Sequence, residues 1–341
     1  MNKTAIITGI TGQDGSYLAE YLLGIGYNVV GIKRRTSTNN QQNIEHIKDP
    51  NFSIIEGDIT DMASMSGIIA DYSPDEFYNL AAQSHVHTSF SQPYYTFQAD
   101  AIGVLNILES IRQFSPSTKL YQAGTSEQFG KNFTAEYDRG SVQLEFFEKK
   151  YQDENTPFAP QSPYAVAKVA AHHLVRLYRE AYNVFGCVGI LFNHESPRRG
   201  ELFVTRKITK YIAALNKHLS TNQSGDFPRL KLGNIDSYRD WGFAGDYVRG
   251  MHLMMQHNKA DDYVLATGET HSVKDFLKEA FKYIGQEYYN WVEIDPALYR
   301  PAEVDYLLGS SNKARHELWW KPTVDFTSLV KMMVEHDIQK A

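Results

Sequence analysis

Short runs of apolar residues recur along the first half of this chain, and longer amphipathic stretches separate them. An apolar run without polar alternation predicts a strand that is buried on both faces, as in a parallel sheet. We predict such strands at residues 4–8, 27–32, 53–59, 76–84 and 120–127, with helices at residues 16–23 and 101–114. This rhythm of strands and helices predicts an α/β fold with a doubly wound parallel sheet.

The alternation loosens in the second half, where we predict a last strand at residues 265–273 and an amphipathic helix at residues 274–284. The chain is long enough for two domains of ordinary size. We expect a Rossmann-like domain at residues 1–192, with residues 232–255 crossing back to it. Residues 193–231 and 256–341 would mainly form a smaller α/β C-terminal substrate domain.

A glycine turn, GITGQDG, occupies residues 9–15, between the first predicted strand and the first helix. Glycines let the backbone turn tightly and approach a pyrophosphate, whose charge then rests on the helix N-terminus. Such a turn can also simply join a strand to a helix, but its place at the start of the chain favours the nucleotide. The spacing G-x-x-G-x-x-G is one residue longer than the dinucleotide fingerprint, and it resembles the short-chain dehydrogenase/reductase superfamily.

The second predicted strand ends in KRRTS at residues 33–37, where an NAD-binding protein usually carries an acid for the ribose 2′-hydroxyl. No acid is present there. Guanidinium groups suit a 2′-phosphate, so we predict NADP as the cofactor. The alternative is a basic turn in solvent. Residues 38–43 are polar without periodicity and predict a loop.

Tyr164 and Lys168 lie four residues apart in QSPYAVAK, residues 161–168. On a helix this spacing places both side chains on one face. A phenol has an ordinary pKa of about 10, and a neighbouring ammonium favours the phenolate. The pair therefore predicts a general base; the alternative is a packed tyrosine beside a solvated lysine.

Thr125 and Glu127 lie two residues apart at the end of the strand predicted at residues 120–127, so they would project from one face if the strand continues that far. Oxidation of an alcohol needs a hydroxyl beside the tyrosine but no carboxylate. A second base is useful when a proton must also leave carbon. Glu127 is thus predicted as that base, with a structural capping role as the alternative.

Charge and composition exclude several function classes. A net charge of −6 gives no basic field for nucleic acid, and no apolar run approaches the length of a membrane span. The short apolar segment at residues 4–8 is too brief for a signal peptide, so we expect a cytoplasmic protein.

A single cysteine, Cys187, excludes an internal disulfide, and its apolar setting predicts a buried strand thiol. Two histidine pairs, His85 with His87 and His172 with His173, lack a convincing third ligand nearby, so we predict no metal site.

Several motifs together resemble the GDP-mannose 4,6-dehydratase family. They occupy residues 9–21, 79–86, 125–127, 162–168, 192–201, 203–208, 240–242 and 300–304. The stretch at residues 193–208 is the most specific, because generic sugar-nucleotide epimerases do not carry it.

This resemblance implies a hydro-lyase that converts GDP-D-mannose to GDP-4-keto-6-deoxy-D-mannose, the first step toward deoxysugars such as GDP-fucose or GDP-rhamnose. By resemblance, Tyr164 takes the proton of the C4 hydroxyl while hydride passes to NADP. Glu127 then removes the C5 proton and assists loss of the C6 hydroxyl as water, and the hydride returns to C6. Thr125 would hold the C4 oxygen, and Lys168 would bind the cofactor ribose and set the pKa of the tyrosine.

Binding residues are implied in the same way, together with a homodimer or homotetramer. The NADP site would comprise Gly9, Ile10, Thr11, Gly12, Gln13, Asp14, Arg34, Arg35, Thr36, Ser37, Asp58, Ile59, Leu80, Ala81, Ala82, Gln83, Ser84, Tyr95, Tyr164, Lys168, His194 and Arg199. The GDP-mannose site would comprise Ser84, Thr125, Ser126, Glu127, Asn193, Val204, Lys207, Arg239, Arg300 and Glu303. Arg206 is a further candidate to meet the diphosphate.

The chain departs from the family pattern between Gly130 and Thr156, where it is longer than expected. The extra residues would form a surface excursion or, alternatively, a partial lid or subunit contact.

Other functions stay open: a GDP-sugar reductase or epimerase would share Tyr164 but have no use for Glu127, and a dehydratase could also reduce its own product. A catalytically idle NADP-binding regulator would have no reason to keep Thr125, Glu127, Tyr164 and Lys168 together.

Overall fold

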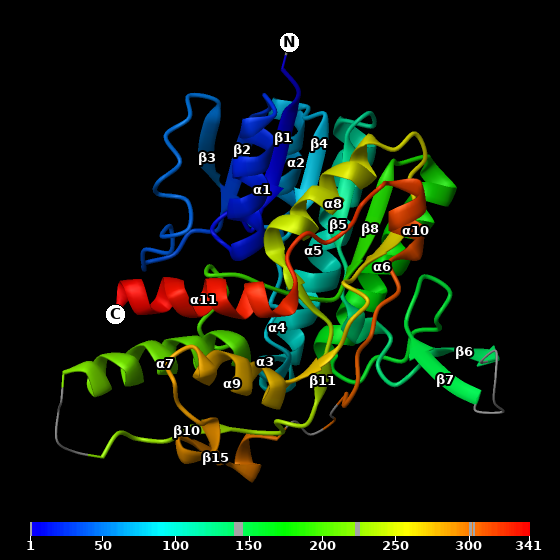
Figure 1. The fold of residues 1–341 in the computed structure, drawn as a ribbon. Helices are drawn as coiled ribbons and strands as arrows, with labels where there is room; N and C mark the ends of the chain where they lie inside the picture. Colours follow the sequence, from blue (N-terminus) through cyan, green and yellow to red (C-terminus); the bar gives the residue numbers. More distant parts are fainter. Residues whose placement is uncertain (1, 140–145, 222–225, 300–301, 303) are drawn as a thin grey trace.

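The centre of the molecule is a seven-stranded parallel sheet with strand order β3-β2-β1-β4-β5-β8-β13 (Figure 1). This computed structural model describes residues 2–139, 146–221, 226–299, 302 and 304–341. The sheet strands are β1 Thr4–Thr8, β2 Asn28–Lys33, β3 Phe52–Glu56, β4 Glu76–Asn79, β5 Lys119–Ala123, β8 Gly186–Leu191 and β13 Asp262–Leu265. The strand order reverses between β1 and β4, which confirms the predicted doubly wound, Rossmann-like fold.

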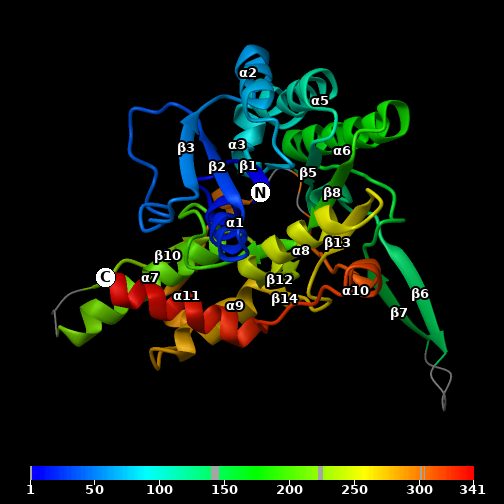
Figure 2. The same cartoon turned by 90° about the horizontal axis from the view of Figure 1, so that it is seen from above.

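Helices cover both faces of the sheet, which is why its strands are apolar throughout (Figure 2). One face is covered by α1 Gln13–Gly24 and α8 Ala244–Gln256, and the other by α2 Met62–Tyr72, α5 Gly103–Phe114 and α6 Pro163–Tyr182. Side chains of β1 alternate between two hydrophobic cores: Ala5 and Ile7 belong to the core that includes Met251 of α8, whereas Ile6 belongs to the core that includes Val104 of α5. The segment before α5 contains α3 Val86–Ser91, α4 Pro93–Phe97 and a π-helical turn, Gln98–Ile102.

A smaller lobe lies beyond the carboxyl ends of the strands (Figure 1). It contains α7 Val204–Ser220, α9 Val273–Lys282, α11 Phe326–Lys340 and the parallel pair β10 Leu230–Leu232 with β15 Val292–Ile294. Its own core includes Ile212, Phe276 and Met333. A buried ion pair joins two of its helices, because Arg206 Nη2 lies 2.7 Å from Asp337 Oδ1.

Short strand pairs connect the lobe to the sheet domain: β9 Asn193–Glu195 with β12 Trp241–Phe243, and β11 Tyr238–Arg239 with β14 His271–Ser272. The strand predicted at residues 265–273 is wrong, because β13 ends at Leu265 and a loop precedes the two-residue β14. Helix α8 packs on α1, β13 extends the sheet, and α10 Asn312–Glu317 packs near β13. The division into domains at residue 192 stays a prediction.

The segment between Gly130 and Thr156 includes an antiparallel hairpin, β6 Thr134–Arg139 and β7 Phe146–Tyr151, which projects from the body in both views (Figures 1 and 2). Residues 140–145 lie outside the described part of the chain. After the hairpin, the Glu154 carboxylate accepts a hydrogen bond from Val264 N on the outer strand β13, at 2.7 Å. The described part of this segment thus forms a surface excursion whose second end is fixed to the edge of the sheet.

Candidate active site

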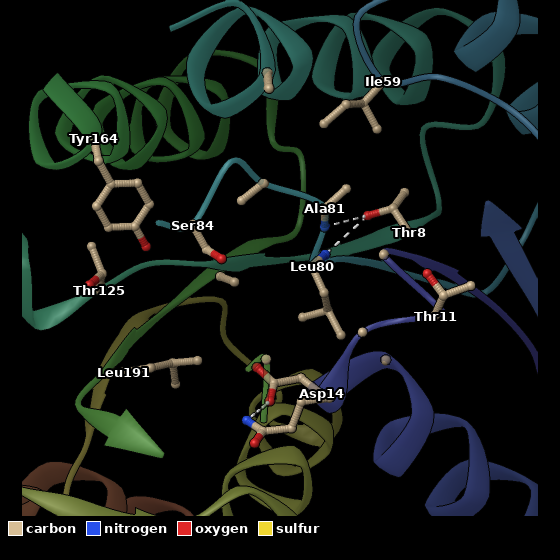
Figure 3. A pocket seen from close by; sticks show the side chains of 18 of the residues that line it. Thr8, Thr11, Asp14, Ile59, Leu80, Ala81, Ser84, Thr125, Tyr164 and Leu191 are labelled. Atoms are coloured by element: carbon tan, nitrogen blue, oxygen red, sulfur yellow. Dashed lines mark hydrogen bonds between the residues drawn. The ribbon is translucent and has the colours of Figure 1, made fainter. Parts of the chain in front are cut away.

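A cavity of about 680 Å³ lies at the carboxyl ends of the sheet strands, where the strand order reverses. Ligands of doubly wound sheets bind at this place. It is lined by residues of β1, β2, β5 and α6, of the loop after β4 and of the β9–α7 connection, several of which are drawn in Figure 3. Tyr164, Thr125 and Ser84 direct their hydroxyl groups toward one part of the cavity (Figure 3).

The glycine turn forms one wall and requires glycine for steric reasons. Gly9 has φ of +65°, and a Cβ there would lie 2.9 Å from the carbonyl carbon of Leu80. At Gly15, a Cβ would lie 2.4 Å from the Gly9 carbonyl oxygen. Thr8 Oγ1 accepts hydrogen bonds from the backbone N–H groups of Leu80 and Ala81, at 3.0 and 3.1 Å (Figure 3). The ends of β1 and β4 are therefore held together behind the turn.

Helix α1 begins directly after this turn, and no side chain accepts a hydrogen bond at its N-terminus. Its N-cap residue is Gly12, whose backbone carbonyl accepts only the first helical bond, from Ser16 N at 3.2 Å. The first N–H groups of a helix carry partial positive charge and favour an anion. The arrangement can therefore bind a phosphate group at this wall.

Two cations line the cavity at the end of β2. Lys33 and Arg34 line the cavity, and the Arg34 guanidinium donates a hydrogen bond to the Tyr95 hydroxyl. Arg35 is exposed and does not line the cavity in this structure. Asn43, in the predicted loop, donates from Nδ2 to the Thr11 carbonyl at 3.1 Å, so this loop folds back onto the glycine turn.

The four predicted catalytic residues all line the cavity. Tyr164 and Lys168 lie in the first two turns of α6 and share a face, as predicted, because the Lys168 Nζ is 5.8 Å from the centre of the tyrosine ring. Ser162 caps this helix by accepting a hydrogen bond from Ala165 N at 3.1 Å. The capped first turn fixes the direction of Tyr164.

Thr125 and Glu127 reach the cavity in a different way from that predicted. The strand does not continue, because β5 ends at Ala123 and residues Ser126–Gln128 form a 3₁₀ turn with Thr125 as its N-cap. Gln128 links this turn to α6, since its side chain accepts from Thr125 N at 3.0 Å and donates to the Lys168 carbonyl at 3.1 Å. The two catalytic segments are thereby held in fixed relation.

Burial dominates the electrostatics of the tyrosine. It raises the pKa of Tyr164, the negative charge of Asp100 raises it further, and a hydrogen bond with Thr125 opposes both. Lys168 is also buried, and burial lowers its pKa while Asp100 opposes this. Its ammonium donates to the Ala123 carbonyl at 3.0 Å. These effects together favour the neutral phenol form of Tyr164.

Most of the predicted binding residues meet at this cavity. For the cofactor these are Gly9, Thr11, Gly12, Gln13, Asp14, Arg34, Asp58, Ile59, Leu80, Ala81, Ala82, Ser84, Tyr95, Tyr164, Lys168, His194 and Arg199, and for the substrate Ser84, Thr125, Ser126, Glu127 and Asn193. Ile10, Arg35, Thr36, Ser37, Gln83, Val204, Lys207 and Arg239 are not among its lining residues. Arg300 and Glu303 lie outside the described residues.

Lining residues that were not among the predicted site residues include Lys33, Asn43, Arg198 and Phe203. Lys33 is adjacent to the predicted arginines, and that basic run was the available signal. Arg206, proposed for the diphosphate, is buried and paired with Asp337, so its charge is already balanced.

Other predictions can be followed in the structure. Cys187 is a buried strand thiol, and burial raises its pKa to about 12. Among the described residues, no group of three or more His, Cys, Asp or Glu side chains could hold a metal ion. No helix in the described ranges is long and apolar enough to cross a membrane.

Solved structures with this fold include proteins with NAD or NADPH bound. A dTDP-glucose 4,6-dehydratase from Streptomyces venezuelae, with NAD and TYD bound, has a TM-score of 0.81 at 20% identity, covering 98% of this chain and 96% of its own. RMD from Pseudomonas aeruginosa, complexed with NADPH, has a TM-score of 0.75 at 20% identity and covers 100% of both chains. At this identity the likeness establishes the fold.

Sequence comparison goes further. The family model described as GDP-mannose 4,6 dehydratase matches residues 6–333. GDP-mannose 4,6 dehydratase 2 from Arabidopsis thaliana is 49% identical over 350 residues, covering 99% of this chain and 88% of the relative. Together with the cavity that brings Tyr164, Lys168, Thr125 and Glu127 together, these matches confirm the predicted family. The chain belongs to the GDP-mannose 4,6-dehydratase family.

Proposed function

We propose that this chain converts GDP-mannose to GDP-4-keto-6-deoxy-mannose at the cavity described above, with NADP bound along its glycine turn. One observation carries the proposal: the cavity joins an uncapped helix N-terminus to two separate candidate bases, Tyr164 and Glu127. A reductase or epimerase needs only the first base, whereas a dehydration needs both.

The residues present fit a nicotinamide dinucleotide. The open N-terminus of α1 suits its pyrophosphate, and Lys33 and Arg34 suit a 2′-phosphate at the end of β2, where no carboxylate competes. Lys168 would hold the ribose next to the nicotinamide. When bound, the cofactor supplies the acceptor and donor of the hydride.

The protein groups would act in sequence. The Tyr164 oxygen takes the proton of the C4 hydroxyl, while Thr125 binds the C4 oxygen. The positive charge of Lys168 lies on the same helix face and favours the phenolate once the substrate excludes water. The Glu127 carboxylate then removes the C5 proton, which the new C4 carbonyl has acidified, and passes a proton to the departing C6 hydroxyl.

The sugar-nucleotide end would extend toward the lobe. Asn193 lines the cavity, and Val204 and Lys207 lie in the first turn of α7, whose N-terminus has no side-chain cap. Lys207 is exposed there and could meet a phosphate. We assign Arg239, Arg300 and Glu303 to the same ligand from the family resemblance.

Incubation of the purified protein with GDP-mannose and NADP tests the proposal. Mass spectrometry should detect a product that has lost one water from the sugar nucleotide, without net consumption of NADP. A product of unchanged mass would indicate an epimerase instead, and a product that requires added NADPH would indicate a reductase.

The choice of NADP is tested by replacing the basic residues. Arg34→Asp and Arg35→Asp should each weaken NADP binding far more than NAD binding, by roughly 10- to 100-fold for a lost charge-assisted contact. Arg34 should have the larger effect, because it lines the cavity. Equal weakening for both cofactors in calorimetric titrations would contradict the assignment.

We also propose a homodimer or homotetramer. Apolar side chains on α4 and α6, two helices packed side by side, are exposed: Tyr94, Phe97, Val166 and Leu177. Light scattering would give the mass, and a monomer at micromolar concentration would refute the proposal. A cytoplasmic location stays a prediction.

A further inference from the structure

His194 joins three separate parts of the chain at the phosphate wall of the cavity. It lies in β9, its Nε2 is 2.7 Å from Asp14 Oδ2 in the first turn of α1, and its ring stacks on Tyr247 of α8 at a centroid distance of 4.7 Å. Gln13 adds a second link between the same segments, since its side chain donates to the His194 carbonyl at 3.1 Å. The position of the glycine turn relative to β9 therefore depends on this contact.

Hydrogen bonding determines the charge of the imidazole. Nδ1 lies 2.8 Å from the Phe192 carbonyl oxygen, which can only accept, so Nδ1 carries a hydrogen. Nε2 faces a carboxylate oxygen, which also accepts when ionised. A neutral imidazole has one N–H and cannot satisfy both partners. Because a carboxylic acid loses its proton at a lower pH than an imidazolium does, the shared proton belongs to His194.

The surroundings support the charged form. His194 is 9% exposed, and the face of Tyr247 favours a cation above it. Burial lowers the pKa of His194, but Asp14 outweighs it and the net pKa is raised; Arg199 opposes Asp14. The pKa of Asp14 is lowered although burial alone would raise it. The other ionisable groups around the pair are Tyr121 of β5, near Asp14, and Glu195, whose carboxylate pairs with Arg199 at 3.1 Å.

The pair has a consequence for an anionic ligand. Asp14 lies in the first turn of α1 and lines the cavity, so a bare carboxylate there would repel a phosphate group that binds the helix N-terminus. The imidazolium cancels that charge. We propose that His194 is a positioning residue that is held as an imidazolium, fixes the glycine turn through Asp14, and makes dinucleotide affinity fall when the ring loses its proton. The part of this proposal that concerns dinucleotide affinity, its binding half, rests on the proposed NADP cofactor.

The direction of the pH dependence follows from linkage. A raised folded pKa gives a stabilising contribution that is complete below the unfolded pKa of about 6.5 and disappears as pH rises through the folded pKa. The lowered pKa of Asp14 gives a contribution that disappears only in acid. Above the folded pKa of His194 the charge of Asp14 is no longer compensated, so affinity for NADP should decline as pH rises through that pKa.

Two measurements test this in the full-length protein. The first follows the His194 ring by nuclear magnetic resonance against pH without nucleotide, assigned by comparison with His194→Gln. The ring should titrate above 6.5 in the wild type. In Asp14→Asn it should titrate lower, because the amide can donate to Nε2 of a neutral ring and preserve the contact without the charge. A wild-type ring that titrates at or below 6.5 would overturn the proposal.

The second measurement is the NADP dissociation constant between pH 7 and pH 9. NADP binding to the wild type should weaken by roughly five- to tenfold over this range, as expected for one uncompensated charge near the phosphates. His194→Gln should bind NADP weakly already at pH 7, and its dissociation constant should approach that of the wild type at pH 9. In Asp14→Asn the NADP dissociation constant should not change with pH, whatever its absolute value. His252→Gln changes a partly buried histidine on α8 away from the cavity, and it should keep the wild-type profile.

The outcomes separate the proposals. A flat wild-type profile, or an alkaline loss that persists in Asp14→Asn, would overturn the role of His194 in binding. Failure to bind NADP at every pH would overturn the proposed cofactor, and the binding half with it, while the ring titration would still decide the charge of His194. Circular dichroism on each variant identifies a loss of folding.

Discussion

Helices α1 and α6 both begin at the cavity, yet their N-termini are built in opposite ways. Helix α6 is capped by the Ser162 side chain, which accepts a hydrogen bond from Ala165 N, and it starts with Pro163, which has no N–H to satisfy. Helix α1 follows Gly12 and has no side-chain cap. The closed helix positions a reacting side chain, Tyr164, and the open one leaves its N–H groups for a ligand. Within one site, catalysis and anion binding thus require different helix starts.

Removing the reacting group of the closed helix should have the largest effect. Tyr164→Phe keeps the ring and deletes only the oxygen, so kcat should fall by about 10⁴, the upper range for a positioned general base. The lost contact with Thr125 should cost about 1 kcal/mol of unfolding free energy or less. Cofactor affinity should be unchanged in a calorimetric titration. Retained turnover would identify another group as the base.

Glu127→Gln tests whether the 3₁₀ turn contributes a second base. The amide keeps the size of the side chain but cannot take the C5 proton, so elimination should slow by about 10²–10⁴ while the first oxidation continues. Bound NADPH, visible by its absorbance, should then accumulate together with a 4-keto sugar that retains its C6 hydroxyl. Elimination at the wild-type rate would assign Glu127 a structural role only.

Giving α1 the cap residue of α6 tests the open helix. In Gly12→Ser the hydroxyl can accept from a first-turn N–H, which should weaken NADP binding by roughly tenfold as the ligand loses a donor. A Cβ at this position lies 3.1 Å from the Gly9 carbonyl, so the gain from capping should be partly offset and the melting temperature should change little. Unchanged affinity would mean that the N–H groups of α1 are not used by the ligand.

The converse change opens α6. Ser162→Ala removes the acceptor for Ala165 N and should cost about 1 kcal/mol of unfolding free energy in denaturant titrations. Turnover should fall by less than in Tyr164→Phe, since the phenol remains. If turnover falls as far as in that variant, the cap is needed to place Tyr164 and not only to stabilise the helix.

Features that depend on neighbouring residues could be predicted from the sequence, whereas features that depend on contacts between distant residues could not. β1 was predicted at its observed bounds, because an apolar run followed by a glycine turn is a local signal. The proximity of Tyr164 and Lys168 could also be predicted, since helical spacing alone places both side chains on one face. By contrast, the turn at Ser126–Gln128 depends on Gln128 reaching α6, and the pairing of Arg206 depends on Asp337, far away in the sequence. Such contacts leave no periodic trace in the sequence.

The carboxylate of Glu154 has a consequence beyond the active site. Strand β13 ends the sheet, and an open edge offers unpaired N–H and C=O groups to a strand of another molecule. Glu154 occupies the outward N–H of Val264 and places an acidic group at that edge. Lys313 of α10 donates to the Asp262 carbonyl of the same strand at 2.9 Å. Together these side chains leave fewer backbone groups of β13 open to a strand of another molecule, so deletion of the segment through Glu154 should increase aggregation even if catalysis is unchanged.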